Sequence, residues 1–310
     1  RDVVRHLVGQ LHAQHGGLVL HDGEPRLKVR RRHVHHQTPL EPGTEALFQD
    51  FHILRWFIRG YDDLLFGTVK TVKCMEKLKE EDSSYTYFHL FTTAISKLVY
   101  ARPYLNRFII AGRMYEREEV TLSFVVKTTF NDSAEELMTV IPVSKEDNLA
   151  MVKDKILSSV NKMRSNNSHD KTNDTINKVG KLPRFLRFII MEIFKFMDSH
   201  DMLPDSLTKD DIYHASVLVS NLGSIKCGAI YHNLTDFGTN SLIITIGDIH
   251  KEVIVNDKGK SEIRDICEFG ITIDERIADG FYLASSAIML QEYFDNPEIL
   301  KENIYEKCTR

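Results

Sequence analysis

One stretch near the carboxyl end constrains the fold more than any other part of the chain. Residues 269–273, Phe-Gly-Ile-Thr-Ile, have the alternating pattern of a β-strand, and the polar turn 274–280 that follows ends in Asp-Gly. Apolar residues then recur at helical spacing over 281–294. A strand that ends in charged residues just before a helix can hold those side chains rigidly in a cleft. The stretch therefore predicts a functional turn between a strand and a helix.

The rest of the pattern is that of an α/β protein, with elements that alternate in type along the chain. Helices are predicted at 85–100, 148–164 and 281–295. Strands of one large mixed sheet are predicted at 120–130, 137–143, 216–220, 241–247, 252–256 and 270–274. Shorter patterns predict a hairpin at 108–115, a strand at 67–74, and a helix or strand within 48–65.

Composition excludes several classes of protein. The hydrophobic share of 42% and the charged share of 27% are those of a globular domain. A net charge of −4 gives no reason to expect nucleic acid as a partner. The four cysteines form no Cys-x-x-Cys pair, which argues against a zinc site and a disulfide framework and favours a reducing cytoplasm. No signal peptide is recognised, and the longest apolar stretches are too short to span a membrane.

Residues 1–45 differ from the rest of the chain. They contain seven of the fourteen histidines and the basic run 28–32, and they lack apolar periodicity after Val19. His33, His35 and His36 could bind a metal, since histidine is a common ligand. We favour the simpler interpretation, an atypical or disordered segment whose histidines have no shared role. The predicted domains are thus an unassigned segment at 1–45 and a folded domain at 46–310.

Residues 182–200 predict a helix that is apolar around most of its circumference, with three cations among the apolar side chains. One interpretation is a helix buried between domains or subunits. The other is an amphipathic helix that lies on a membrane surface. Burial is favoured, because the cations do not gather on one polar face.

Several short motifs occur in a fixed order along the chain. They are Pro103-x-x-Asn106, Ser220-Asn-Leu-Gly223, a strand ending in Gly247, a hairpin, and Glu275-x-x-x-Asp279-Gly280. This order resembles the chloramphenicol acetyltransferase and dihydrolipoyl acyltransferase superfamily, whose signature is His-x-x-x-Asp-Gly. The resemblance covers residues 85–300. Within the superfamily, the chain is similar to a bacterial branch whose signature reads Asp-Glu-Arg. It implies a chloramphenicol acetyltransferase-like fold, a mixed-sheet α/β sandwich with packed helices.

The resemblance also implies roles for three residues. In the family the histidine is the general base, and here Glu275 stands at its position. Ser220 matches the hydroxyl that hydrogen-bonds the tetrahedral oxyanion, and Asp279 matches an aspartate that pairs with an arginine to fix the turn. A carboxylate ordinarily titrates near ~4.3 and is a weak base toward a thiol or hydroxyl, unless burial raises its pKa.

The resemblance further implies coenzyme A as co-substrate, no metal, a small-molecule acyl acceptor and a homotrimer whose sites form between subunits. Three hypotheses remain open. The chain is a CoA-dependent acyltransferase of the 2-oxo acid dehydrogenase type that uses Glu275 as its base, or a non-catalytic relative that binds CoA or only assembles. The third is a membrane-associated interaction protein that uses residues 182–200, which we favour least.

Overall fold

The computed structural model describes residues 37–39, 54–58, 69–110, 112–127, 136–165, 182–200, 202–204, 208, 211–235, 237–255 and 259–305. All of them belong to His33–Arg310, the second of two compact units into which the chain divides. The interpretation of residues 1–45 therefore falls outside the described residues, apart from the three residues of β1 (Gln37–Pro39).

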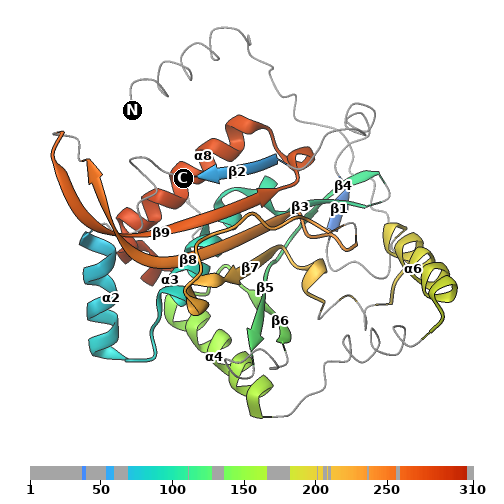
Figure 1. The fold of residues 1–310 in the computed structure, drawn as a ribbon, viewed down its shortest axis with the longest axis horizontal. Helices are drawn as coiled ribbons and strands as arrows, with labels where there is room; N and C mark the ends of the chain where they lie inside the picture. Colours follow the sequence, from blue (N-terminus) through green and yellow to red (C-terminus); the bar gives the residue numbers. More distant parts are fainter. Residues whose placement is uncertain are drawn as a thin grey trace, which may run out of the picture. The chain divides into compact units, whose positions relative to one another are not determined.

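The main sheet has six strands in the order β2-β9-β8-β7-β5-β6. Their bounds are β2 (Leu54–Ile58), β9 (Ser261–Ile273), β8 (Leu242–Val255), β7 (Val217–Asn221), β5 (Val120–Lys127) and β6 (Glu136–Val143). β7 is parallel to both of its neighbours, β8 and β5, whereas the other pairs are antiparallel. Figure 1 shows these strands side by side. The predicted mixed sheet is confirmed.

A second, smaller sheet has the order β1-β4-β3. β3 (Arg107–Ile110) and β4 (Arg113–Arg117) are antiparallel neighbours with Phe108 opposite Tyr115, so the predicted hairpin is confirmed. β3 lies beside the signature turn at 275–277, which brings this small sheet to the candidate site.

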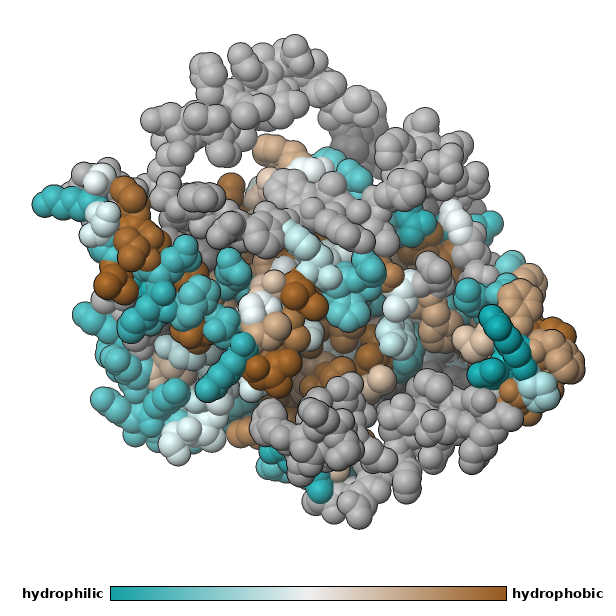
Figure 2. Space-filling model, viewed as in Figure 1, coloured by the Kyte–Doolittle hydropathy of each residue, from teal (hydrophilic) through white to brown (hydrophobic). Residues whose placement is uncertain are grey.

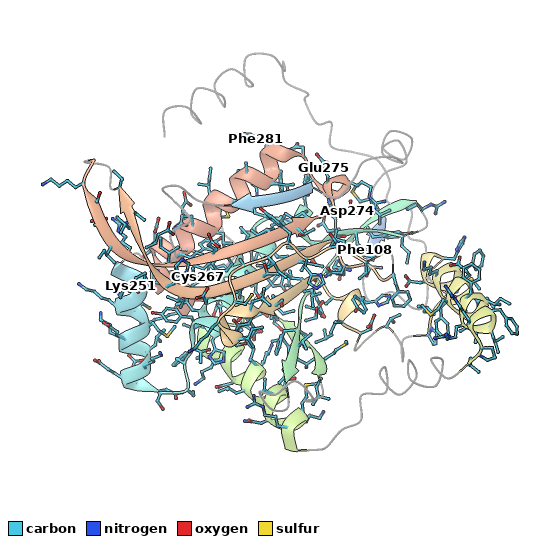
Figure 3. All side chains as sticks on the ribbon, in the orientation of Figure 1. Phe108, Lys251, Cys267, Asp274, Glu275 and Phe281 are labelled. Atoms are coloured by element: carbon cyan, nitrogen blue, oxygen red, sulfur yellow. The ribbon has the colours of Figure 1, made fainter. Side chains whose placement is uncertain are left out.

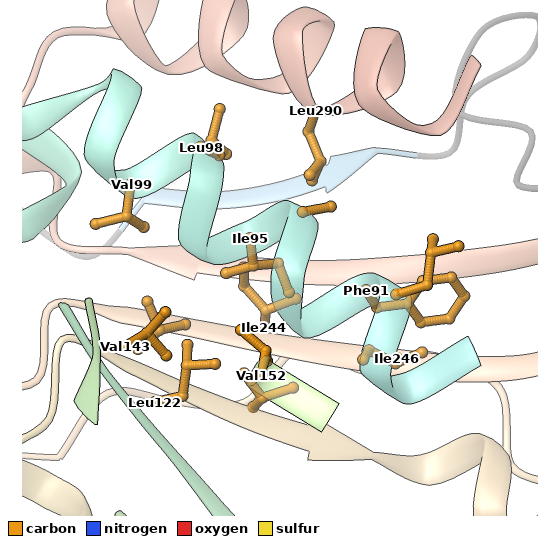
Figure 4. Packing of buried hydrophobic residues seen from close by; sticks show 14 of the residues in the cluster. Phe91, Ile95, Leu98, Val99, Leu122, Val143, Val152, Ile244, Ile246 and Leu290 are labelled. Carbon is orange, nitrogen blue, oxygen red and sulfur yellow. The ribbon is translucent and has the colours of Figure 1, made fainter. Parts of the chain in front are cut away.

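Four helices contribute buried side chains to one core cluster, together with residues of the main sheet. They are α2 (Val69–Glu81), α3 (Tyr87–Ala101), α4 (Leu149–Ser165) and α8 (Gly280–Asp295). α3 lies at the centre: Figure 4 shows Phe91 and Ile95 of α3 close to Ile244 and Ile246 of β8, with Leu290 of α8 nearby. Leu218 of β7 and Ile243 of β8 point to the other face of the sheet, where they form a separate cluster with Ile212. The sheet is therefore buried on both faces, and α2, α3, α4 and α8 cover one of them.

His89 of α3 is a structural histidine, as its position on a predicted helix suggested. The backbone N–H of Thr86 donates to Nδ1 of His89 over 3.1 Å. Burial lowers the pKa of His89 to about 4, so the ring is neutral and can accept this hydrogen bond.

Two predictions about the elements were wrong. Residues 69–81 form helix α2 rather than a strand from 67 to 74, because the valines that suggested alternation precede a buried helical stripe of Cys74, Met75 and Leu78. β8 also does not end at Gly247. It continues to Val255 through an irregularity between Ile246 and Ile249, because its pairing with β9 resumes beyond that point.

The packing of the core predicts that two nearby positions of α8 differ greatly in how much their side chains contribute to the free energy of unfolding. Leu290 is 0% exposed and Ile288 is 53% exposed. Leu290→Ala should lower the free energy of unfolding by about 2–5 kcal/mol, because it leaves a cavity beside α3. Ile288→Ala should change it by less than about 0.5 kcal/mol. Urea unfolding of both variants measures this, and equal losses would contradict the described packing.

Candidate functional site

The signature turn is held by a buried carboxylate. Asp274 follows the last residue of β9 and is buried, and its Oδ1 accepts hydrogen bonds from the backbone N–H of Arg276 at 3.1 Å and from its Nε at 2.8 Å. Nη2 of Arg276 donates to Oδ2 of Asp274 over 2.5 Å. The hydrogen bonds to Asp274 raise the pKa of Arg276, so its guanidinium stays charged. Both oxygens of Asp274 thus hold the short 3-10 helix η4 (Glu275–Ile277) in place.

Glu275 is the first residue of η4 and is half-buried. Figure 3 places Asp274 and Glu275 together at the turn that joins β9 to α8, with Phe108 of β3 below them. The backbone has left strand geometry at this point, so the side chain of Glu275 is not forced into the core as that of Ile273 is. The guanidinium of Arg276 pairs with Asp274.

Asp279 is the N-cap of α8. Its Oδ1 accepts a hydrogen bond from the backbone N–H of Tyr282 over 2.7 Å, which satisfies one of the free N–H groups of the first helical turn. Among the described residues, the arginine of the turn pairs with Asp274, and the pairing of Asp279 with an arginine stays a prediction.

Gly280 is the first residue of α8. A β-carbon at Gly280 would meet no heavy atom within 4 Å, so within one chain the position has room for a side chain.

Ser220 lies near the end of β7, opposite Thr245 of β8 in the parallel register. Its strand neighbours Val217 and Val219 belong to the core cluster beneath the helices, whereas Leu218 belongs to the cluster on the other face. Alternation along the strand therefore directs Ser220 to the face opposite α2, α3, α4 and α8, where it is half-buried.

An extended segment, residues 227–231, crosses that face beside Ser220. Thr245 Oγ1 donates a hydrogen bond to the carbonyl oxygen of Ile230 over 2.5 Å. A β-carbon at Gly247 would lie 2.7 Å from the backbone nitrogen of Ala229, and one at Gly270 would collide with the carbonyl of Ile230. The two glycines are therefore required for the segment to lie this close to the sheet.

Ser220 and Glu275 of one chain do not meet. Ser220 is opposite Thr245, which is opposite Gly270, whereas Glu275 lies five residues beyond Gly270 and past the end of β9. Two strand spacings across the sheet and at least four residues along it separate the two α-carbons by on the order of 15 Å. A hydrogen-bonded network needs about 3 Å, so one chain alone does not bring the two predicted residues together.

The sequence did not suggest one buried cluster that the structure reveals. Nδ1 of His214 lies 2.6 Å from Oδ2 of Asp211, and its Nε2 lies 2.9 Å from Oδ1 of Asp198 on α6 (Arg184–Ser199). The other oxygen of Asp198 accepts from the backbone N–H of Gly238 over 2.7 Å. Asp211 and His214 are three residues apart, a local signal, but Asp198 is brought in only by the fold. The cluster fastens the end of α6 to the segment before β7.

His214 is ionised at neutral pH. Burial alone would lower the pKa of His214, but hydrogen bonds to Asp198 and Asp211 and their negative charges outweigh it and raise the pKa to about 9. The cluster is thus a cation held between two buried carboxylates.

Part of the chain is similar to a known family of proteins. The family model of the 2-oxoacid dehydrogenases acyltransferase (catalytic domain) matches residues 199–301, which include Ser220, Glu275 and Asp279. The predicted resemblance is confirmed. The match covers the part of the chain in which β7, β8, β9 and α8 carry the signature motifs. None of the curated proteins matches this sequence.

Several solved structures share the fold of this chain. A probable dihydrolipoamide acetyltransferase from Listeria monocytogenes 4b F2365 has 17% identity and a TM-score of 0.51, over 82% of this chain and 87% of that chain. The cubic core of the pyruvate dehydrogenase multienzyme complex has 13% identity and a TM-score of 0.54, over 80% and 83%. The dihydrolipoamide acetyltransferase of Azotobacter vinelandii, studied for the role of a serine, a histidine and an asparagine in its mechanism, has 14% identity and a TM-score of 0.54, over 80% and 84%.

No group of three or more His, Cys, Asp or Glu side chains in the ranges that the structure describes could hold a metal ion. None of the helices in the described part of the chain has the length and apolar character needed to cross a bilayer.

Capping by Asp279 can be separated from charge pairing. Asp279→Ala should lower the free energy of unfolding by about 1 kcal/mol, because the N–H of Tyr282 loses its acceptor. Asp279→Asn should retain most of that stability, since an amide oxygen also caps. Thermal or urea unfolding measures both. If the asparagine variant loses as much as the alanine variant, the charge of Asp279 matters rather than its cap.

The His214 cluster predicts a pH-dependent stability. Because folding raises its pKa from 6.5 to about 9, His214 stabilises the fold fully below pH 6.5, and this contribution is lost as pH rises through about 9. It amounts to at most about 3 kcal/mol. The difference in unfolding free energy between the natural chain and His214→Gln should therefore shrink from pH 6 to pH 10 by that amount. Parallel pH profiles for the two proteins would contradict the assignment.

Proposed function

We propose that residues 46–310 form a CoA-dependent acyltransferase of the 2-oxo acid dehydrogenase acyltransferase type that works as a homotrimer in the cytoplasm. One observation carries this proposal. The stretch that matches the acyltransferase catalytic domain contains the turn at which Asp274 and Arg276 hold Glu275, and it also contains Ser220, which lies on the face of the sheet opposite α2, α3, α4 and α8. These are the positions of a base and an oxyanion donor in such a site.

The proposed reaction transfers an acyl group from the thioester of acyl-CoA to a thiol or hydroxyl of a small acceptor. Glu275 takes the proton of the acceptor, and the acceptor atom attacks the thioester carbonyl. The Ser220 hydroxyl donates a hydrogen bond to the oxyanion that forms. Collapse of this intermediate breaks the carbon–sulfur bond, and the CoA thiolate that leaves takes the proton back from Glu275. The products are the acylated acceptor and CoA, and no metal is needed for any step.

The distance between Ser220 and Glu275 supports the oligomeric part of the proposal. Since the two α-carbons of one chain are on the order of 15 Å apart, a shared site needs the turn of one copy to face β7 of another. Closed rings of identical subunits repeat such a contact, and the space beside Gly280 leaves room for a neighbour. The acceptor would then bind between subunits.

A second candidate function rests on the residue that replaces the signature histidine. A carboxylate is a poor base unless its surroundings raise its pKa, and a missing base typically costs about 10²–10⁴-fold in rate. The chain could therefore be a non-catalytic relative that binds CoA or serves assembly. Binding of CoA without turnover would favour this candidate.

The proposal is tested by acetyl transfer from acetyl-CoA to dihydrolipoamide and to hydroxyl acceptors, followed by release of the CoA thiol. Glu275→Gln should lower kcat by at least about 10²-fold, and Ser220→Ala by about 10²–10³-fold. Glu292→Gln, an exposed glutamate on α8, is the matched control and should keep full activity.

Glu275→His restores the signature residue and separates the two candidates. The acyltransferase proposal predicts that this variant keeps or increases transfer. Suppose instead that the natural chain and this variant both fold and bind CoA, and that both are inactive on every acceptor. The site then lacks more than its base. The non-catalytic candidate would then be preferred.

A further inference from the structure

α6 exposes an unusual amount of apolar surface for a helix of a globular domain. The exposed fraction is 69% for Phe185, 67% for Phe188 and 48% for Ile189. Met191 and Ile193 of the same helix are also exposed, at 45% and 52%. Figure 2 shows these brown and tan side chains gathered at the outer edge of α6. Scattered exposed apolar residues need no explanation, but a contiguous patch marks an interaction surface.

The exposed apolar side chains lie in one stripe. Phe185, Ile189 and Ile193 are four residues apart, so they lie above one another on the same face of the helix. Phe196, 57% exposed, extends the stripe by one turn and stacks on His200 with a ring distance of 4.1 Å. The sequence had favoured burial of this helix, but within the chain its apolar stripe faces outward.

Cations border the stripe. Arg184 and Lys195, eleven residues and thus three turns apart, lie on the same flank of the helix, and Arg187 is also exposed. The exposed acidic residue of the helix is Glu192, 3.9 Å from Lys195. The exposed charges of α6 therefore sum to three positive and one negative, although the whole chain carries a net charge of −4.

The helix is fastened to the folded domain at one end. Asp198 is buried and binds both His214 and the backbone N–H of Gly238, so the last turn of α6 is fixed on the segment that leads to β7. A partner that engages the stripe therefore engages the whole domain rather than a loose helix.

We propose that the outer face of α6 docks on an anionic lipid surface, with the apolar stripe in the boundary between headgroups and acyl chains. At 16 residues, with five ionisable side chains, α6 is too short and too polar to cross a bilayer but has the pattern of a helix that lies in its plane. Charge complementarity favours this occupant over a second copy of α6. Two such helices packed stripe to stripe would bring Arg184 and Lys195 of both copies close to one another.

Flotation of the full chain with vesicles tests the proposal. The protein should bind vesicles of phosphatidylcholine that contain phosphatidylserine more tightly than vesicles of phosphatidylcholine alone, and added salt should weaken the binding. Phe185→Ser combined with Ile189→Ser and Ile193→Ser should weaken binding by at least about tenfold, because the removed side chains no longer bury apolar area. Arg184→Glu combined with Lys195→Glu should weaken binding to the anionic vesicles by about tenfold.

Val253→Ser combined with Ile263→Ser is the matched control. These two residues are as exposed as those of α6, at 64% and 69%, but lie on the ribbon of β8 and β9, so vesicle binding should not change. Sedimentation of each variant reports its oligomeric state. The proposal is overturned if the natural chain binds neither kind of vesicle. It is also overturned if the α6 serine variant changes the oligomeric state and not vesicle binding, since the stripe would then cover a second copy.

Discussion

The candidate site depends on the ion pair that Asp274 makes at the end of β9. A buried carboxylate must be paired or hydrogen-bonded, and here three donors of Arg276 satisfy it. The pair converts the end of a strand into one turn of 3-10 helix and leads directly to the cap that Asp279 places on α8. Glu275 is thus held by its two neighbours in sequence. Removal of the Arg276 side chain would release the turn and leave the buried carboxylate of Asp274 without two of its donors.

The sheet imposes the second constraint on the site. Its helices cover one face, and the extended segment at 227–231 lies on the other because Gly247 and Gly270 leave room for its backbone. Ser220 belongs to this second face, while Glu275 lies beyond the end of β9. The fold thus separates the two residues within a chain and leaves each available to a neighbour. The proposed mechanism and the proposed assembly are consequently one hypothesis rather than two.

Much of the fold could be predicted because its elements are long and strongly patterned. The helix at α3 and the strands β5 and β6 bury one continuous apolar face each, and their predicted bounds agree with the structure to within three residues where the residues are described. α2 was missed because a few valines fit a strand and a helix equally well. The exposed ribbon of β8 and β9 was predicted too short because few of its side chains are buried.

The site was harder to predict than the fold, because its residues interact across the chain. The sequence suggested Glu275, Ser220 and Asp279 by their motifs, but not that Arg276 would bind Asp274 or that Asp279 would cap a helix. The Asp198–His214–Asp211 cluster joins residues on two elements, and only the pair at spacing three leaves a local trace. Likewise, periodicity identified the apolar side chains of α6 but not which of them would face outward.

The most direct test of the central claim is complementation between two inactive variants. Glu275→Gln and Ser220→Ala chains are mixed under conditions that exchange subunits, and acetyl transfer is compared with that of each variant alone. If each site takes Glu275 from one subunit and Ser220 from the next, about a quarter of the sites in a random equal mixture combine both intact residues. The account therefore predicts that the mixture recovers about a quarter of the natural activity. A mixture that exchanges subunits and is no more active than its parents would contradict it.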